Sequence, residues 1–214
     1  MQTGYCSDSW WLVIGLIIVG VGILNAYNFM DGVNGMTALY SLVTVGTLWY
    51  WQVWHSYTEN DPILPCIFVA LLIFSYFNVR TQAVCFAGDV GSISIGFISL
   101  FFLVTIINRY QTYLPILFLS VYGVDTVLTI LYRIYLRQNI LQAHRLHLFQ
   151  RLVHRLGWPH LRVSALYALM QLAINAVTLK AMCWSPMAQW SAVWVVLSSL
   201  SLLYSVATNR LMNL

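Results

Sequence analysis

A polar cluster near the start of the chain contains residue types that bind charged ligands. Residues 25–35 read Asn-Ala-Tyr-Asn-Phe-Met-Asp-Gly-Val-Asn-Gly, and an apolar run lies on each side of them. Amide and carboxylate side chains supply oxygen ligands, and glycine allows the backbone to approach a ligand closely. The apolar flanks predict that this first motif lies at a membrane boundary. A polar turn that leads into a helix, with Asp31 as its cap, is the alternative interpretation.

A second motif, residues 86–92, reads Phe-Ala-Gly-Asp-Val-Gly-Ser and also precedes an apolar run. We expect Ser92 to cap the helix that follows. The backbone N–H groups at a helix N-terminus attract anions, and Asp89 beside them suits a divalent metal ion that bridges to phosphate oxygens. A turn with a capping serine explains the same residues without a ligand.

A third motif, residues 143–151, reads Ala-His-Arg-Leu-His-Leu-Phe-Gln-Arg in a basic part of the chain. If it is helical, its spacing puts His144 and His147 on one face. Two imidazoles without a third ligand make a poor zinc site, whereas His and Arg side chains together suit a diphosphate and a uridine. His154 and His160 lie outside the motif, and we expect them at the membrane interface.

The composition identifies an integral membrane protein. Hydrophobic residues make up 60% of the 214 residues and charged residues only 7%, whereas about 25% charged is usual for a soluble domain. The cysteines have no CxxC spacing, so they indicate neither a zinc site nor a disulfide framework; they are Cys6, Cys66, Cys85 and Cys183. We expect a lipid bilayer as the environment and no nucleic acid as a partner.

Seven apolar runs approach the length of about 20 residues that crosses the hydrocarbon of a bilayer. They are residues 10–24, 35–54, 63–77, 92–107, 114–131, 163–182 and 190–207. We therefore predict an all-α, polytopic transmembrane bundle of about seven helices, folded as a single integral-membrane domain over residues 1–214. Asp125 lies deep in the fifth run, where an ionisable side chain is costly and is either functional or paired with another helix.

The basic residues predict which side faces the cytoplasm, because Lys and Arg in short loops are retained there. Arg80, Arg210 and the arginines between residues 133 and 162 fall on one side of the alternating helices, and Arg109 and Lys180 fall on the other. The three motifs are then cytoplasmic. Residues 1–9, 55–62 and 108–113 are external.

Together the motifs resemble the polyprenyl-phosphate N-acetylhexosamine-1-phosphate transferases, a group within glycosyltransferase family 4 that starts O-antigen and cell-envelope polysaccharides. The family pattern NxxNxxDGxxG is matched by Asn25, Asn28, Asp31, Gly32 and Gly35. The second motif resembles the family's GDxGS element, the third resembles its AHRxHxxQ form, and Asp125-Thr126 resembles an Asp-Thr of many relatives. Asn34 departs from relatives that carry a second Asp, and a neutral amide cannot supply that negative charge.

The resemblance implies transfer of N-acetylhexosamine 1-phosphate from a UDP-sugar to polyprenyl (undecaprenyl) phosphate, with release of UMP, at the bacterial inner membrane. It implies Mg²⁺, or alternatively Mn²⁺, held by Asp89 and Asp31. The implied catalytic residues are Asp31, Asp89, His144 and His147; the implied substrate-binding residues are Asn25, Asn28, Gly88, Ser92, Arg145 and Gln150. A UDP-N-acetylhexosamine, a polyprenyl phosphate and the bilayer are the expected partners, and homo-oligomerisation is left open.

An adjacent acidic pair, which family members carry in an earlier cytoplasmic loop, has no counterpart in this sequence. The acidic residues are Asp8, Asp31, Glu59, Asp61, Asp89 and Asp125, and no two are neighbours. We therefore expect the chain to correspond to the C-terminal part of a transferase and to catalyse no transfer alone. The alternatives are a non-catalytic remnant of the family and a polytopic transporter with Asp125 on its ion path.

Overall fold

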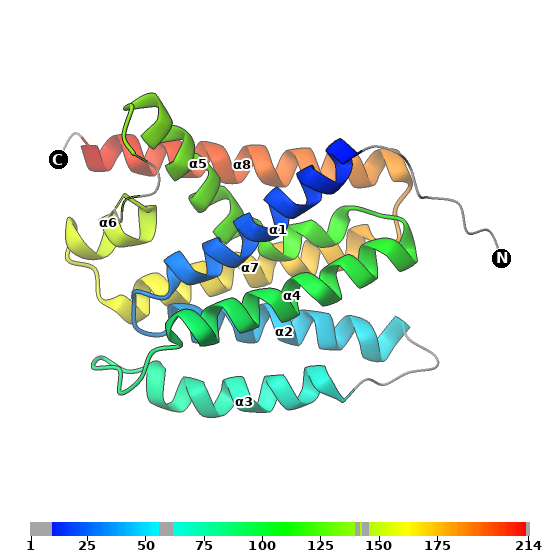
Figure 1. Cartoon of the computed structure of the whole chain (residues 1–214), viewed down its shortest axis with the longest axis horizontal. Coiled ribbons are helices and arrows are strands. Elements are labelled where there is room, and N and C mark those ends of the chain that lie inside the picture. Colours follow the sequence, from blue (N-terminus) through cyan, green and yellow to red (C-terminus); the bar gives the residue numbers. More distant parts are fainter. Residues whose placement is uncertain (1–9, 56–61, 140–141, 143–145, 213–214) are drawn as a thin grey trace.

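The computed structural model describes residues 10–55, 62–139, 142 and 146–212, and every regular element within them is a helix (Figure 1). The elements are α1 (Trp10–Met30), α2 (Met36–His55), α3 (Ile63–Asn78), α4 (Gly88–Tyr110), the 3-10 helix η1 (Leu114–Leu119), α5 (Ser120–Tyr135), α6 (Leu148–His154), α7 (His160–Ala181) and α8 (Pro186–Met212). The predicted all-α fold class is confirmed.

Five helical segments are long and apolar enough to cross a membrane. They are Val13–Met30, Gly88–Tyr110, Leu114–Tyr135, His160–Ala181 and Pro186–Leu211, and the shorter helix α3 is also apolar. A helix satisfies its own backbone hydrogen bonds, which a chain in lipid must do because no water is there to replace them. The molecule is thus a polytopic helical membrane bundle.

Helix α2 runs through the interior of the bundle between α3 and α7 (Figure 1). Its buried side chains include the hydroxyls of Thr37, Ser41, Thr44 and Thr47. A helix that is surrounded by protein can carry polar side chains that would be costly against lipid. This explains why α2, although 20 residues long, is not among the five apolar spans.

Three buried tyrosines form the centre of the main core. The rings of Tyr40 and Tyr122 stack with their centroids 3.4 Å apart, and Tyr27 meets Tyr122 edge-on with centroids 5.5 Å apart. Gly96 allows α4 to approach this core, because a Cβ atom there would lie 3.3 Å from Tyr27. The tyrosines come from α1, α2 and α5, so they fix the helices that carry the first motif and Asp125.

The fifth apolar run is broken, whereas residues 114–131 were predicted as one continuous helix. The 3-10 helix η1 leads into α5 at Ser120. Gln171 of α7 satisfies the backbone at this junction: its amide donates to the Leu117 carbonyl at 2.8 Å, and its oxygen accepts the Val121 N–H at 3.0 Å. Irregular backbone at membrane depth is tolerated where protein groups satisfy it in this way.

The turns of the bundle separate into two ends. Figure 1 shows that the loop after α1, the loop between α3 and α4, and helix α6 lie at the same end as the C-terminus. The C-terminal ends of α2 and α4 and the turn between α7 and α8 lie at the opposite end. The described parts of the three motifs therefore share one end of the molecule.

Candidate active site

Hydrogen bonds join the first motif to the second. The Asp31 carboxylate accepts the Gly88 backbone N–H at 2.7 Å, and the Ser92 hydroxyl donates to the Asn28 amide oxygen at 3.0 Å. These partners are 57 and 64 positions apart in the sequence. The end of α1 and the start of α4 therefore form a single polar site.

Asp31 caps α4, and not the helix that follows it in the sequence. One carboxylate oxygen receives the first N–H of α4, and the other accepts the Thr37 hydroxyl at 2.8 Å. A carboxylate at a helix N-terminus is favoured by the open N–H groups and by the helix dipole. The prediction that Ser92 caps this helix is wrong: α4 already begins at Gly88, and the Ser92 hydroxyl lies 2.7 Å from the Gly88 carbonyl, one turn back.

Asp89 lies exposed in the first turn of α4, directly after the residue that Asp31 holds. The two carboxylates therefore lie at the same helix N-terminus. Asn25 and Asn28 belong to the last turns of α1, because this helix continues to Met30, beyond its predicted end at residue 24. Asn25 is exposed and Asn28 is half-buried.

Asn34 organises the loop that leads to the second motif. Its side-chain amide donates to the Arg80 carbonyl at 3.0 Å and to the Thr81 carbonyl at 2.9 Å. Its backbone carbonyl accepts the Ser164 hydroxyl at 2.7 Å, and its N–H lies 3.3 Å from His160 Nδ1. The Asn34 side chain thus acts as a hydrogen-bond donor within the fold. His160, which was expected at the membrane interface, contacts the first motif, whereas His154 is exposed.

A buried asparagine that the sequence analysis did not single out supports the same loop. The Asn78 side-chain oxygen accepts the Gly35 N–H at 2.9 Å, and its nitrogen donates to the Cys85 carbonyl at 2.8 Å. Gly35 has a φ of +81°, which favours glycine. Asn78 is buried and directly follows an apolar run, and an amide in that sequence position is the signal that could have identified it.

The described part of the third motif, residues 146–151, begins beside the end of α1. The motif's residues His144 and Arg145 fall outside the described residues. His147 has an extended backbone, with φ −58° and ψ 146°, and α6 begins at the next residue. The helical condition under which both histidines would share one face is therefore not met at His147. The His147 ring is only 2% exposed and lies 6.0 Å from the Phe29 ring, centroid to centroid. Gln150 is half-buried within α6.

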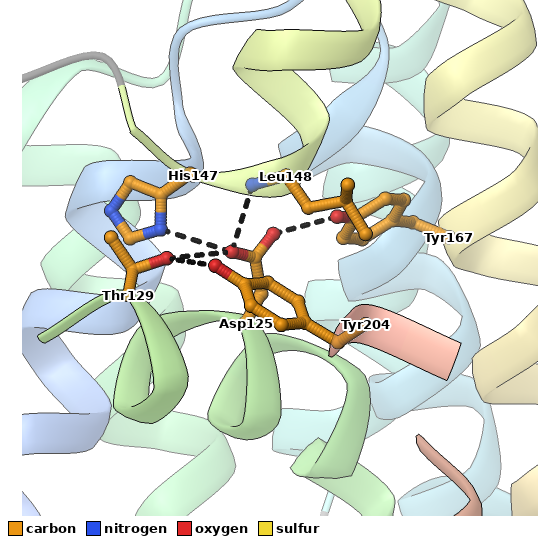
Figure 2. Close-up of polar contacts among 6 residues, drawn as sticks. All are labelled: Asp125, Thr129, His147, Leu148, Tyr167 and Tyr204. Atoms are coloured by element: carbon orange, nitrogen blue, oxygen red, sulfur yellow. Dashed lines mark hydrogen bonds and ion pairs between the residues drawn. The ribbon is translucent and has the colours of Figure 1, made fainter. Parts of the chain in front are cut away.

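Asp125 binds His147 in the interior of the bundle (Figure 2). One carboxylate oxygen lies 3.2 Å from His147 Nδ1, 3.1 Å from the Leu148 N–H and 3.2 Å from the Thr129 hydroxyl. The other oxygen accepts the Tyr167 hydroxyl at 2.6 Å. An ionised carboxylate only accepts hydrogen bonds, and each of these neighbours can donate.

These contacts realise the interhelical pairing that was one of the two interpretations of Asp125. They connect α5 with α7 and with the start of α6, and Thr129 extends them to the Tyr204 hydroxyl of α8 at 2.7 Å. Asp125 is 2% exposed. Its oxygens are thus engaged by protein groups, which gives the transporter interpretation no support. The polar residues Tyr167, Thr129 and Tyr204, which complete this cluster, were not identified from the sequence.

Comparison with known proteins gives a family match and relatives that agree with one another. The model of glycosyl transferase family 4 matches residues 2–107. Phospho-N-acetylmuramoyl-pentapeptide-transferase of Thermotoga maritima is 27% identical over 175 residues, which cover 80% of this chain and 54% of the relative. Probable undecaprenyl-phosphate N-acetylglucosaminyl 1-phosphate transferase of Bacillus subtilis is 27% identical over 177 residues, which cover 79% of this chain and 49% of the relative.

A shorter match gives a higher identity. Phospho-N-acetylmuramoyl-pentapeptide-transferase of Lacticaseibacillus paracasei is 32% identical over 95 residues, which cover 44% of this chain and 29% of the relative. The chain spans about half the length of the Thermotoga and Bacillus relatives. The family match covers the first motif, the second motif and most of α4. The chain belongs to glycosyl transferase family 4.

Proposed function

We propose that this chain binds a UDP-N-acetylhexosamine and contributes to the transfer of its sugar 1-phosphate to a polyprenyl phosphate in the bacterial inner membrane. One observation carries the proposal: the hydrogen bonds from Asp31 to Gly88 and from Ser92 to Asn28 join two motifs into one polar site at a helix N-terminus. Such a site favours phosphate, because open N–H groups and the helix dipole attract anions. The names of the two relatives supply the sugar class, and that of the Bacillus subtilis protein supplies the polyprenyl carrier.

The residues present fit a divalent metal ion that is shared with a phosphate ligand. Within the described part of the chain, no group of three or more His, Cys, Asp or Glu side chains could form a complete metal site. Mg²⁺, however, is usually held by one or two carboxylates together with substrate phosphates. Asp89 and Asp31 would supply the carboxylates, and Asn28 could add an amide oxygen. When bound, Mg²⁺ would offset negative charge on the diphosphate.

In the proposed site these residues would have different roles. Asp89 is exposed and can reach a ligand from solvent. Asp31 fixes the start of α4 and hence the direction of Asp89. The apolar helices around the site would keep the chain of a polyprenyl phosphate in the bilayer while its phosphate reaches this end of the bundle. Positioning and charge stabilisation are the main contributions that a protein makes to phosphoryl transfer.

Binding of UDP-N-acetylglucosamine to the full chain in lipid nanodiscs, measured by titration calorimetry with and without Mg²⁺, tests the proposal. We expect Mg²⁺-dependent binding, and Asp89→Asn should weaken it at least tenfold, or about 1.4 kcal/mol, because an amide lacks the charge of a carboxylate. Asp61→Asn removes a carboxylate from the connection between α2 and α3 and should leave the affinity unchanged. Absence of Mg²⁺-dependent binding by the wild type would overturn the proposal.

Transfer itself is measured as release of UMP that depends on polyprenyl phosphate. The chain is assayed alone and together with the upstream half of the Bacillus subtilis relative, added in trans or joined to it. We expect release only when the upstream half is present, and its loss in Asp89→Asn. Release that is equally fast with Asp89→Asn would remove Asp89 from the mechanism.

A further inference from the structure

The Asp125 carboxylate serves two groups at the start of α6. It meets the imidazole of His147, and it accepts the N–H of Leu148, the first residue of that helix. His147 occupies the cap position of α6 but makes no capping bond with its own side chain. A carboxylate from another helix therefore does what a local capping side chain does elsewhere.

The surroundings of His147 favour a fixed ring. The ring lies close to two aromatic rings, with centroids 6.0 Å from Phe29 and 5.7 Å from Phe149, and it is 2% exposed. Phe29 lies two residues before Asp31 in the first motif. His147 thus connects the buried Asp125 with the end of α1 that leads to Asp31, and a solvent ligand has almost no access to its ring.

We propose that Asp125 and His147 form a buried clamp that fixes the start of α6 against the end of α1. Both are positioning residues of the ligand-binding end. This assigns to His147 a role different from direct contact with the diphosphate. The carboxylate sets the position and the tautomer of the imidazole, and the imidazole in turn places the third motif beside the first.

The clamp makes a specific prediction about a proton. An imidazole nitrogen that faces a carboxylate acceptor carries the hydrogen, in the neutral ring as well as in the imidazolium. His147 should therefore be protonated at Nδ1, the nitrogen that Figure 2 shows directed at Asp125. In Asp125→Asn the new amide can donate to Nδ1, and this favours the tautomer with the hydrogen on Nε2.

Nitrogen-15 NMR of the full chain in nanodiscs, with labelled histidine, tests this prediction without any assumption about function. The His147 signals are assigned from their loss in His147→Asn. We expect Nδ1 of wild-type His147 to carry a proton, and we expect the Nε2–H tautomer to become dominant in Asp125→Asn. Tyr167→Phe is the matched control: it removes the bond to the other carboxylate oxygen, so the tautomer should not change. An unprotonated Nδ1 in the wild type would overturn the clamp.

The functional half of the inference rests on the proposed binding of a UDP-sugar. Asp125→Asn and His147→Asn should each weaken binding of Mg²⁺ and UDP-N-acetylglucosamine about tenfold, and the double variant should be no weaker than either single one, because both changes open the same clamp. Tyr167→Phe should stay within about twofold of the wild type. Additive losses, or an unaffected Asp125→Asn, would contradict the clamp and favour direct contact by His147. If the wild type binds no UDP-sugar, the proposed function fails, while the NMR measurement still decides the clamp.

Discussion

At the scale of single residues, the amides of Asn34 and Asn78 are framework and the carboxylates are candidates for chemistry. The side chains of Asn34 and Asn78 form hydrogen bonds with backbone groups of Gly35 and of the loop that leads to α4. Asp89 makes no hydrogen bond with its carboxylate to the described part of the chain and lies exposed. Asp31 belongs to both groups: it is part of the framework because it caps α4, and it is a candidate for chemistry because Asp89 directly follows the residue that it binds. Residue type alone did not separate these roles.

Asn34→Asp tests this division of labour. The new oxygens would face the carbonyls of Arg80 and Thr81, which now accept hydrogen bonds from the amide. We expect a loss of stability of about 1–3 kcal/mol, seen as faster hydrogen exchange in residues 79–87, and no gain in Mg²⁺ affinity. Asn25→Asp, on the exposed side of α1, is the control and should leave exchange unchanged. Tighter Mg²⁺ binding by Asn34→Asp with an unchanged loop would show that the position can act as a ligand.

At the scale of elements, hydropathy predicted the helices but not their ends. Apolar runs located the long helical segments of the described residues, because burial in lipid depends on composition. The extension of α1 over Asn25 and the start of α4 at Gly88 depend on contacts between distant segments, such as Asp31 with Gly88. The same holds for the break at Ser120, which a side chain of α7 stabilises. The sharing of one end by the three motifs followed from alternation of the helices and could be predicted.

Gln171→Leu tests how the break between η1 and α5 is maintained. The change leaves the Leu117 carbonyl and the Val121 N–H without their side-chain partner, and it also removes the bond from the Tyr40 hydroxyl at 2.7 Å. We expect a loss of about 1–3 kcal/mol in the free energy of unfolding, measured by denaturant titration in micelles with tryptophan fluorescence. Gln138→Leu makes the same chemical change at an exposed position after α5 and should be nearly neutral. Equal effects of the two changes would mean that the junction does not depend on Gln171.

At the scale of the whole molecule, the two ends differ in charge as well as in chemistry. The end that carries the polar site also carries Arg80 and Arg155. The backbone carbonyl of Arg80 accepts a hydrogen bond from the Asn34 amide, and the guanidinium of Arg155 donates to the Leu211 carbonyl at 3.0 Å. Arg109 and Lys180 lie in the last turns of α4 and α7, at the other end. An excess of positive charge at one end is the usual mark of a cytoplasmic face, and a nucleotide-sugar is also a cytoplasmic substrate in the proposed reaction.

Thiol labelling tests this orientation with exposed positions at each end. Gln82→Cys lies in the connection between α3 and α4, and Gln111→Cys directly follows α4. Each is introduced into a chain whose native cysteines have been replaced, in cells with an intact inner membrane. An impermeant maleimide should label Gln111→Cys at once and Gln82→Cys only after permeabilisation, because eight of the ten basic residues fall on the Gln82 side of the alternating helices. Gln82 belongs to the loop whose backbone Asn34 and Asn78 bind and which leads to Gly88, the partner of Asp31. Labelling of Gln82→Cys from outside would therefore put the carboxylates of Asp31 and Asp89 on the external face. Such a result would remove access to a cytoplasmic UDP-sugar and contradict the proposed function as well as the topology.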